Sequence, residues 1–139
     1  MEELALHILD LVENSIRAES TKISIQVMEN RRKDRMDIRI EDNGKGMDKE
    51  TLHKAVNPFF TSREGKTTGL GLALFAQAAG EAGGKMEIHS APGKGTSIHA
   101  FFQLGHIDRK PTGNIAETVD ILKQTHEEIE FDYEYIVIN

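Results

Sequence analysis

The sequence predicts an α/β fold, a two-layer sandwich in which helices cover one face of a mixed sheet. Two observations lead to this prediction. Segments with apolar residues at helical spacing alternate along the chain with pairs of segments whose apolar residues recur at every second position. A last helical segment and a last apolar strand extend this order at the C-terminal end. We therefore expect helix, hairpin, helix, long loop, helix and hairpin, followed by an added helix and strand.

Composition limits the class of protein. The 139 residues are enough for one domain with a real core, and 38% hydrophobic with 29% charged residues excludes a disordered or membrane-spanning chain. Cysteine is absent, which excludes disulfides and makes the cytoplasm the simplest location. The net charge of -6 argues against nucleic acid as the partner. Such a chain binds an anion only through local groups, such as backbone N–H groups, a metal ion and a few cations.

Residues 3–18 are predicted to form the first helix, because six residues at helical spacing form one apolar stripe. Asp10 and Asn14 lie one turn apart on its more polar side, where a plain solvated face is the alternative interpretation. The stripe consists of Leu4, Ile8, Leu11, Val12, Ser15 and Ile16.

Two alternating runs, 22–28 and 36–42, predict the strands of a hairpin. Asp42 has the parity of the three apolar residues that alternate before it, so it points toward the buried face. A carboxylate there is costly unless a partner pairs with it. Gly44 and Gly46 follow, and glycine lets the backbone approach a ligand closely. The other interpretation is an ordinary turn with a solvated aspartate.

A short helix, capped by Asp48, is expected to run to about Val56. The stretch 59–68 then has no periodicity, and it carries the cations Arg63 and Lys66. Long loops inside compact domains are often functional lids, although these cations also suit a solvated loop.

Gly69-Leu70-Gly71-Leu72 opens a second helix that ends at Gly83-Gly84. Strands are expected over 85–90 and 96–104, with a tight turn between them. Past residue 104 the sequence pattern changes, so we expect one domain over 1–104 and an extension over 105–139 packed on it. The extension is predicted to form a helix over about 115–130 and a strand over 131–138. This strand either completes the domain's own sheet or pairs with a second molecule.

Three glycine-rich turns occur in a fixed order, Asp42-x-Gly44-x-Gly46, Gly69-Leu-Gly71 and Gly93-Lys-Gly95. With Pro-Phe-Phe-Thr-Ser (58–62), Thr-Gly-Leu-Gly-Leu (68–72) and Ala-Pro-Gly-Lys-Gly-Thr (91–96), they resemble the GHKL superfamily of ATP-binding domains. The resemblance covers about residues 3–104 and is greatest to the catalytic domain of two-component histidine kinases. It implies the Bergerat-type α/β sandwich with ATP and Mg²⁺ as cofactors.

The same resemblance implies roles for single residues. Asn14 matches the family's metal ligand, and Asp42 matches the residue that accepts a hydrogen bond from the exocyclic amine of adenine. The glycines match positions where the backbone passes close to the nucleotide. Gly93 and Gly95 are instead predicted to form a structural turn behind the pocket. The expected nucleotide-binding set is Asn14, Asp42, Gly44, Gly46, Arg63, Lys66, Thr68, Gly69, Leu70, Gly71 and Leu72.

Two departures from the family pattern bear on activity. Members that hydrolyse ATP carry a glutamate four residues before the metal-binding asparagine, whereas this chain has the shorter Asp10, a candidate catalytic base. None of the six histidines precedes the domain in a helix suited to a phospho-acceptor. We therefore expect transfer of the γ-phosphate to a partner protein in trans, with a homodimer left open. The alternatives are a nucleotide-dependent protein-binding module without transfer and a slow ATPase using Asp10.

Overall fold

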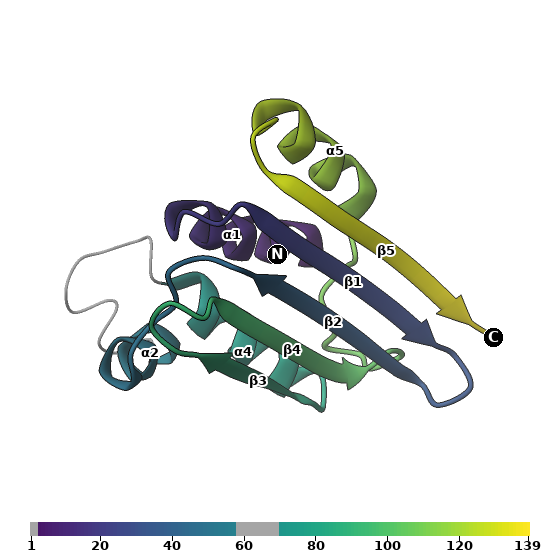
Figure 1. Ribbon diagram of the computed structural model, residues 1–139. Helices are drawn as coiled ribbons and strands as arrows, with labels where there is room; N and C mark the ends of the chain where they lie inside the picture. The colour runs from purple at the N-terminus through teal and green to yellow at the C-terminus, as the bar shows by residue number, and fades with distance from the viewer. Residues whose placement is uncertain (1–2, 58–69) are drawn as a thin grey trace.

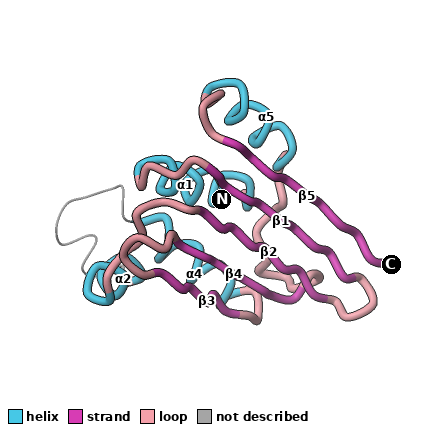
Figure 2. The backbone as a smooth tube through the Cα atoms, in the orientation of Figure 1, coloured by secondary structure: helices cyan, strands magenta, loops and turns pink. Residues whose placement is uncertain are grey.

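The computed structural model describes residues 3–57 and 70–139 and confirms the predicted α/β class with a mixed sheet. Figure 2 shows the helices and strands along the chain. The expected lid, including Arg63, Lys66 and Thr68, and Gly69 after it, lie outside the described residues. The helices are α1 (Leu4–Arg17), α2 (Lys49–Val56), α4 (Leu70–Glu81) and α5 (Ile115–Thr125), and the strands are β1 (Lys22–Asn30), β2 (Arg35–Asp42), β3 (Lys85–Ser90), β4 (Thr96–Gln103) and β5 (Glu130–Ile138).

The five strands form one sheet in the order β3-β4-β2-β1-β5. All neighbours are antiparallel except β1 and β5, which run parallel (Figure 1). In this register Ile25 of β1 lies opposite Ile40 on one side and Tyr133 on the other. Because β5 pairs with β1 along its whole length, the C-terminal strand extends the sheet at the edge opposite β3.

The core lies between the sheet and the helices α1 and α4, which Figure 1 shows behind the sheet. Alternate residues of the three central strands point to this layer and are buried, as the period of two predicts. Their neighbours point to the other face, which carries mainly polar side chains and is covered by no described helix. The buried strand residues are Ile23, Ile25, Val27, Met36, Ile38, Ile40, Ile98, Ala100 and Phe102.

The predicted end of the last helix, near Glu130, is wrong, because α5 ends at Thr125. The Thr125 hydroxyl donates to the carbonyl groups of Ile121 and Leu122, a local bond that favours helix termination. A turn of four residues then brings Ile129 into the core before β5 begins. The shorter helix therefore allows the chain to reverse and join the sheet.

In the part of the chain that the structure describes, no helix combines the length and the apolar character needed to cross a bilayer.

Candidate functional site

A cavity of about 360 Å³ lies between the sheet and the helices, at the end where β2 finishes and β4 begins. Its volume is within the usual range for a small-molecule site. One part of its wall is apolar and suits a flat ring, and another part carries amide, hydroxyl, carboxylate and cationic groups. The apolar wall consists of Leu11, Met47, Ala55, Leu72 and Ile98, and the polar wall includes Asn14, Ser15, Arg17, Asp42, Lys45, Thr51 and Thr96.

Asp42 is held at the bottom of this cavity by three hydrogen bonds. Its Oδ2 accepts from the Ser15 hydroxyl at 2.5 Å, while its Oδ1 accepts from the backbone N–H of Gly44 at 2.9 Å and of Thr96 at 3.2 Å. These donors fix the carboxylate between α1 and the sheet, in the orientation that the strand parity predicts. Oδ2 has capacity for a second donor, so Asp42 presents a fixed acceptor to whatever enters the cavity.

The two glycines after Asp42 are required by the tight packing of this turn. A Cβ at Gly44 would lie 2.7 Å from the Ser20 hydroxyl and 2.8 Å from the Ala18 carbonyl oxygen. Gly46 has φ of +70°, and a Cβ there would lie 2.0 Å from the carbonyl oxygen of Ala91. The cavity floor is therefore a backbone surface that larger residues would disrupt.

The turn behind the floor ties this segment to the β3–β4 hairpin. The Ser90 hydroxyl accepts from the Met47 N–H at 2.9 Å and donates to the Gly95 carbonyl oxygen at 3.0 Å. Gly93 donates its N–H to the Lys45 carbonyl oxygen at 2.7 Å. The third glycine-rich turn thus supports the pocket from outside it, in the manner expected from the sequence.

Asn14, the residue before Ser15 on α1, also lines the cavity, and its amide oxygen accepts a hydrogen bond from the guanidinium of Arg17. Gly71, in the first turn of α4, lies against this part of α1. A Cβ there would be 3.3 Å from Asp10 Cβ and 3.7 Å from Asn14 Nδ2. The start of α4 therefore meets the polar side of α1 at one end of the cavity, where helix N–H groups favour an anion.

Sequence reasoning missed several residues of this site. Ser15 was assigned to the apolar stripe, but its buried hydroxyl positions Asp42. Arg17 follows Asn14 at helical spacing, and this spacing is the signal that would have identified it. Thr96 was the last residue of the quoted Ala-Pro-Gly-Lys-Gly-Thr motif, yet its backbone N–H bond to Asp42 depends on how β2 and β4 pair.

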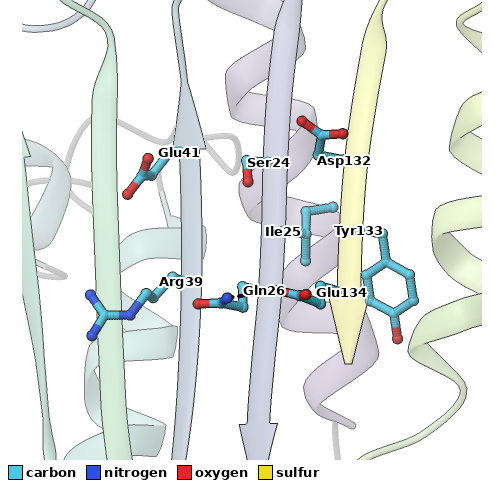
Figure 3. Close-up of a pocket in the computed structure, with 8 residues that line it drawn as sticks. All are labelled: Ser24, Ile25, Gln26, Arg39, Glu41, Asp132, Tyr133 and Glu134. Atoms are coloured by element: carbon cyan, nitrogen blue, oxygen red, sulfur yellow. Dashed lines mark hydrogen bonds between the residues drawn. The ribbon is translucent and has the colours of Figure 1, made fainter. Parts of the chain in front are cut away.

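A second depression, about 490 Å³, lies on the open face of the sheet (Figure 3). Arg39 and Glu41 project from β2 and Asp132 from β5, while Gln26 donates to Glu134 across the β1–β5 pair at 2.8 Å. The side chains that project into it are polar and partly satisfied, so it lacks the apolar slot that a purine needs. We therefore place the candidate nucleotide site in the smaller cavity.

Farther along the open face, Asp37 joins Arg35 and His99. Arg35 donates twice to the Asp37 carboxylate, both bonds being 3.0 Å, and His99 Nε2 lies 2.7 Å from its Oδ1. Burial on its own would raise the pKa of Asp37, but these hydrogen bonds outweigh it and lower the pKa below the ordinary value. The cluster lies on the face opposite the cavity, so its role is to join β2 to β4.

Comparison with known proteins places this geometry in a family. Residues 2–106 match the family described as histidine kinase-, DNA gyrase B- and HSP90-like ATPase. The chain is 39% identical over 91 residues to the sensor protein kinase FleS of Pseudomonas aeruginosa, which covers 64% of this chain and 22% of that protein. It is 30% identical over 98 residues to the sensor histidine kinase YvrG of Bacillus subtilis, which covers 68% of this chain and 17% of that protein. The chain spans less than a quarter of the length of the curated relatives that it matches.

Among solved structures, the ATPase domain of Aquifex aeolicus MutL, determined with ADP, has a similar fold. The TM-score is 0.59 at 19% sequence identity, and the alignment covers 97% of this chain and 60% of that one. The match to the family model ends near residue 106, before α5 and β5 begin.

Proposed function

The chain belongs to the family of histidine kinase-, DNA gyrase B- and HSP90-like ATPases, and from this premise we propose that it binds Mg²⁺-ATP in the cavity around Asp42. We further propose that it transfers the γ-phosphate to a partner protein in trans. The sensor kinases that it resembles support the second part, although the chain corresponds to only a fraction of each.

The observation that carries the proposal is the fixed carboxylate of Asp42 at the end of an apolar slot. Three donors hold it in place, so its Oδ2 can accept the exocyclic amine of adenine without rearrangement. Leu11, Met47 and Leu72 line the slot, which suits the faces of a purine ring. Guanine presents a carbonyl oxygen at the corresponding position, so the same carboxylate disfavours GTP.

The other end of the cavity suits the phosphates. The N-terminus of α4 lies there together with Arg17, and both attract negative charge. Arg63, Lys66, Thr68 and Gly69, outside the described residues, are proposed from sequence to join them. Bound Mg²⁺ would neutralise part of the triphosphate charge.

The residues present fit a magnesium ion held largely by phosphate and water. Asn14 supplies a hard amide oxygen at this end of the cavity, and Mg²⁺ commonly takes only one or two protein ligands. Among the described residues, no group of three or more acidic, histidine or cysteine side chains forms a separate metal cage. For the ion to reach Asn14 Oδ1, Arg17 must move from that oxygen, which would free its guanidinium for a phosphate.

In the proposed transfer, a nucleophilic atom of the partner's acceptor side chain forms a bond to the γ-phosphorus as the bond to the β–γ bridging oxygen breaks, which leaves ADP. A slow ATPase is a second candidate, because Asp10 lies beside the start of α4, one helical turn before Asn14. A third candidate binds a protein partner in response to ATP without any transfer. We also propose a cytoplasmic location, where ATP is supplied, and a homodimeric assembly.

Titration calorimetry of the full chain tests the binding step. ATP with Mg²⁺ should bind more tightly than GTP with Mg²⁺, and removal of the metal with a chelator should weaken binding of ATP. Asn14→Ala should lose this metal-dependent part, while Glu13→Ala, the adjacent exposed position on α1, should keep it. Equal affinity for ATP and GTP would remove the proposed role of Asp42.

Incubation with γ-labelled ATP, with and without extract from the source cells, then separates the three activities. Label on a second protein supports transfer, release of labelled phosphate by the purified chain supports hydrolysis, and binding with neither result supports the binding module. Asn14→Ala should abolish whichever activity is seen. Label that persists with this variant would point to a contaminating kinase.

A further inference from the structure

The outer edge of β5 has no strand partner among residues 3–57 and 70–139, because β5 is the last strand of the sheet. Figure 1 shows α5 beside the first part of β5, while the second part continues past the helix. The exposed fractions follow this division, since Phe131 is buried whereas Tyr135, Val137 and Ile138 are 37%, 41% and 39% exposed. The second half of β5 is therefore an open strand edge bordered by apolar and aromatic side chains.

The hydrogen bonds of β5 show which peptide groups face outward. The Glu130 N–H donates to the Thr21 carbonyl oxygen at 2.9 Å, and the Ile138 carbonyl oxygen accepts from the Arg31 N–H at 2.8 Å. Even-numbered residues of β5 thus direct their peptide groups toward β1, and successive residues alternate. The N–H and C=O groups on the outer edge belong to Phe131, Tyr133, Tyr135 and Val137.

The second half of this edge lacks the usual protection against pairing. Exposed edge strands are commonly protected by lysine, proline or a bulge, and residues 130–138 contain neither lysine nor proline. The carboxylates lie in the first half, where Glu130 and Asp132 contact Lys22 at 3.4 and 3.8 Å and Glu134 accepts from Gln26. Residues 135–138 carry no charge. The edge is therefore acidic at its start and uncharged where it is open.

We propose that a second copy of this chain pairs with the outer edge of β5, with the two β5 strands antiparallel about a two-fold axis at Tyr135. Such an interface is self-complementary, and it joins the two sheets into one. A second copy fits the charge distribution of the strand, because an antiparallel copy centred on Tyr135 keeps the carboxylates of the two strands apart, whereas the registers centred on Tyr133 and on Glu134 bring them together.

These two registers bring like charges together. An axis at Tyr133 would place Asp132 opposite the partner's Glu134 twice, and an axis at Glu134 would oppose that residue to its own copy. An axis at Tyr135 places Glu134 opposite Ile136 and opposes no two carboxylates. It also pairs outward-facing residues with outward-facing residues, so that the free N–H and C=O groups find partners.

The side chains at the axis suit burial between two copies. Tyr135 faces the helical side of the sheet, as its partner Val27 on β1 does. Burial and a hydrogen bond with Glu29 raise the pKa of Tyr135 to about 12. The cavity lies at the start of β1, where Ile23 pairs with Asp42, so the interface leaves it open. The inference does not depend on nucleotide binding.

A charge-reversal pair tests the two-fold axis directly. The parent chain should sediment with about twice the 15.5 kDa mass of one chain. Tyr135→Lys and Tyr135→Glu should each be monomers, because like charges would meet at the axis and raise the dissociation constant by about a hundredfold or more. Mixing the two variants should restore the dimer, since Lys then faces Glu. A parent that is monomeric throughout a dilution series, or a mixture that stays monomeric, would overturn the proposal.

Two further measurements keep the test independent of folding. Ile121→Lys, at an exposed apolar position on α5, is the matched control and should remain dimeric. Because the chain lacks cysteine, Tyr135→Cys should form a disulfide-linked dimer on oxidation, whereas Ile121→Cys should not. Equal cross-linking of both variants would show that the contact is nonspecific and refute the axis. Nucleotide affinity measured on Tyr135→Lys should equal that of the parent, which separates failure of this surface from failure of the nucleotide site.

Discussion

Replacing Asp42 with asparagine tests the assignment of the nucleotide pocket with little change of shape. The substituted side chain keeps one oxygen, which can still accept from the N–H groups of Gly44 and Thr96 as Oδ1 does now. Its amide nitrogen then occupies the position of Oδ2, beside the Ser15 hydroxyl. That hydroxyl can accept as well as donate, so the local hydrogen bonds are retained with one reversed.

The loss should therefore fall on the ligand. An amide nitrogen cannot accept from the adenine amine, and a donor would face a donor in the pocket. Loss of a charge-assisted hydrogen bond to a partly buried carboxylate corresponds to about 1–3 kcal/mol of binding free energy. At 1.4 kcal/mol per factor of ten, the dissociation constant for ATP should rise by about 5- to 150-fold. The free energy of unfolding should change by about 1 kcal/mol or less, since three contacts are kept.

Titration calorimetry with Mg²⁺-ATP measures the affinity, and urea unfolding followed by circular dichroism measures the stability. Glu41→Gln is the matched control, because it removes a carboxylate from the adjacent residue of β2 on the open face. The control should bind ATP as the parent does. An unchanged dissociation constant for Asp42→Asn, with normal folding, would refute the proposed contact with adenine.

Three further predictions concern the metal, the floor and the open face. Asn14→Ala should lose the Mg²⁺-dependent part of ATP binding and keep adenosine binding, as measured by calorimetry; an equal loss for both ligands would make the residue structural. Gly46→Ala should lower the free energy of unfolding, measured in urea, by about 2–4 kcal/mol, because the added Cβ would lie 2.0 Å from a backbone carbonyl oxygen. Gly80→Ala is the control: its Cβ would meet nothing within 4 Å, so this variant should be as stable as the parent or more stable. Asp37→Asn should cost about 1–3 kcal/mol at pH 7. Because the pKa of Asp37 is lower in the folded chain than in the unfolded chain, this contribution is complete well above the ordinary aspartate value and is lost as the pH falls through the lowered folded value. Thermal melts of parent and variant should therefore converge in acid, and a difference that stays constant with pH would contradict the ion-pair assignment.

The sequence allowed good prediction of local structure, because the apolar periods of two and 3.6 are local signals. The strand over 36–42 and the inward direction of Asp42 follow from parity alone, and the structure has both. The order of strands in the sheet did not follow, because pairing joins residues far apart in the chain. The parallel pairing of β5 with β1 brings Glu134 against Gln26, 108 residues away, and only the packing of both strands determines it.

In the candidate site, the contacts between different helices and strands could not be predicted from the sequence either. Ser15 was placed correctly on the buried side of α1, but its bond to Asp42 depends on how α1 crosses the end of β2. Arg17 was not among the residues expected at the site, whereas the structure directs its guanidinium to Asn14. The proposed residues from Arg63 to Gly69 remain predictions from sequence, as does the domain boundary near residue 104.

The alternation of β2 explains why this strand presents one carboxylate to a ligand and keeps others away from it. Asp37 and Glu41 point to the open face, where the first is bonded to Arg35 and His99 and the second is exposed. Asp42 has the opposite parity, so it enters the layer that holds the apolar residues Met36, Ile38 and Ile40 of the same strand. It does so at the last residue of the strand, beyond which the core gives way to the cavity. A carboxylate at an earlier position of β2 on the same face would be buried without a partner. A carboxylate at the position next to Asp42 faces solvent instead. The end of β2 is thus the place where this fold can direct an acceptor inward and still admit a ligand.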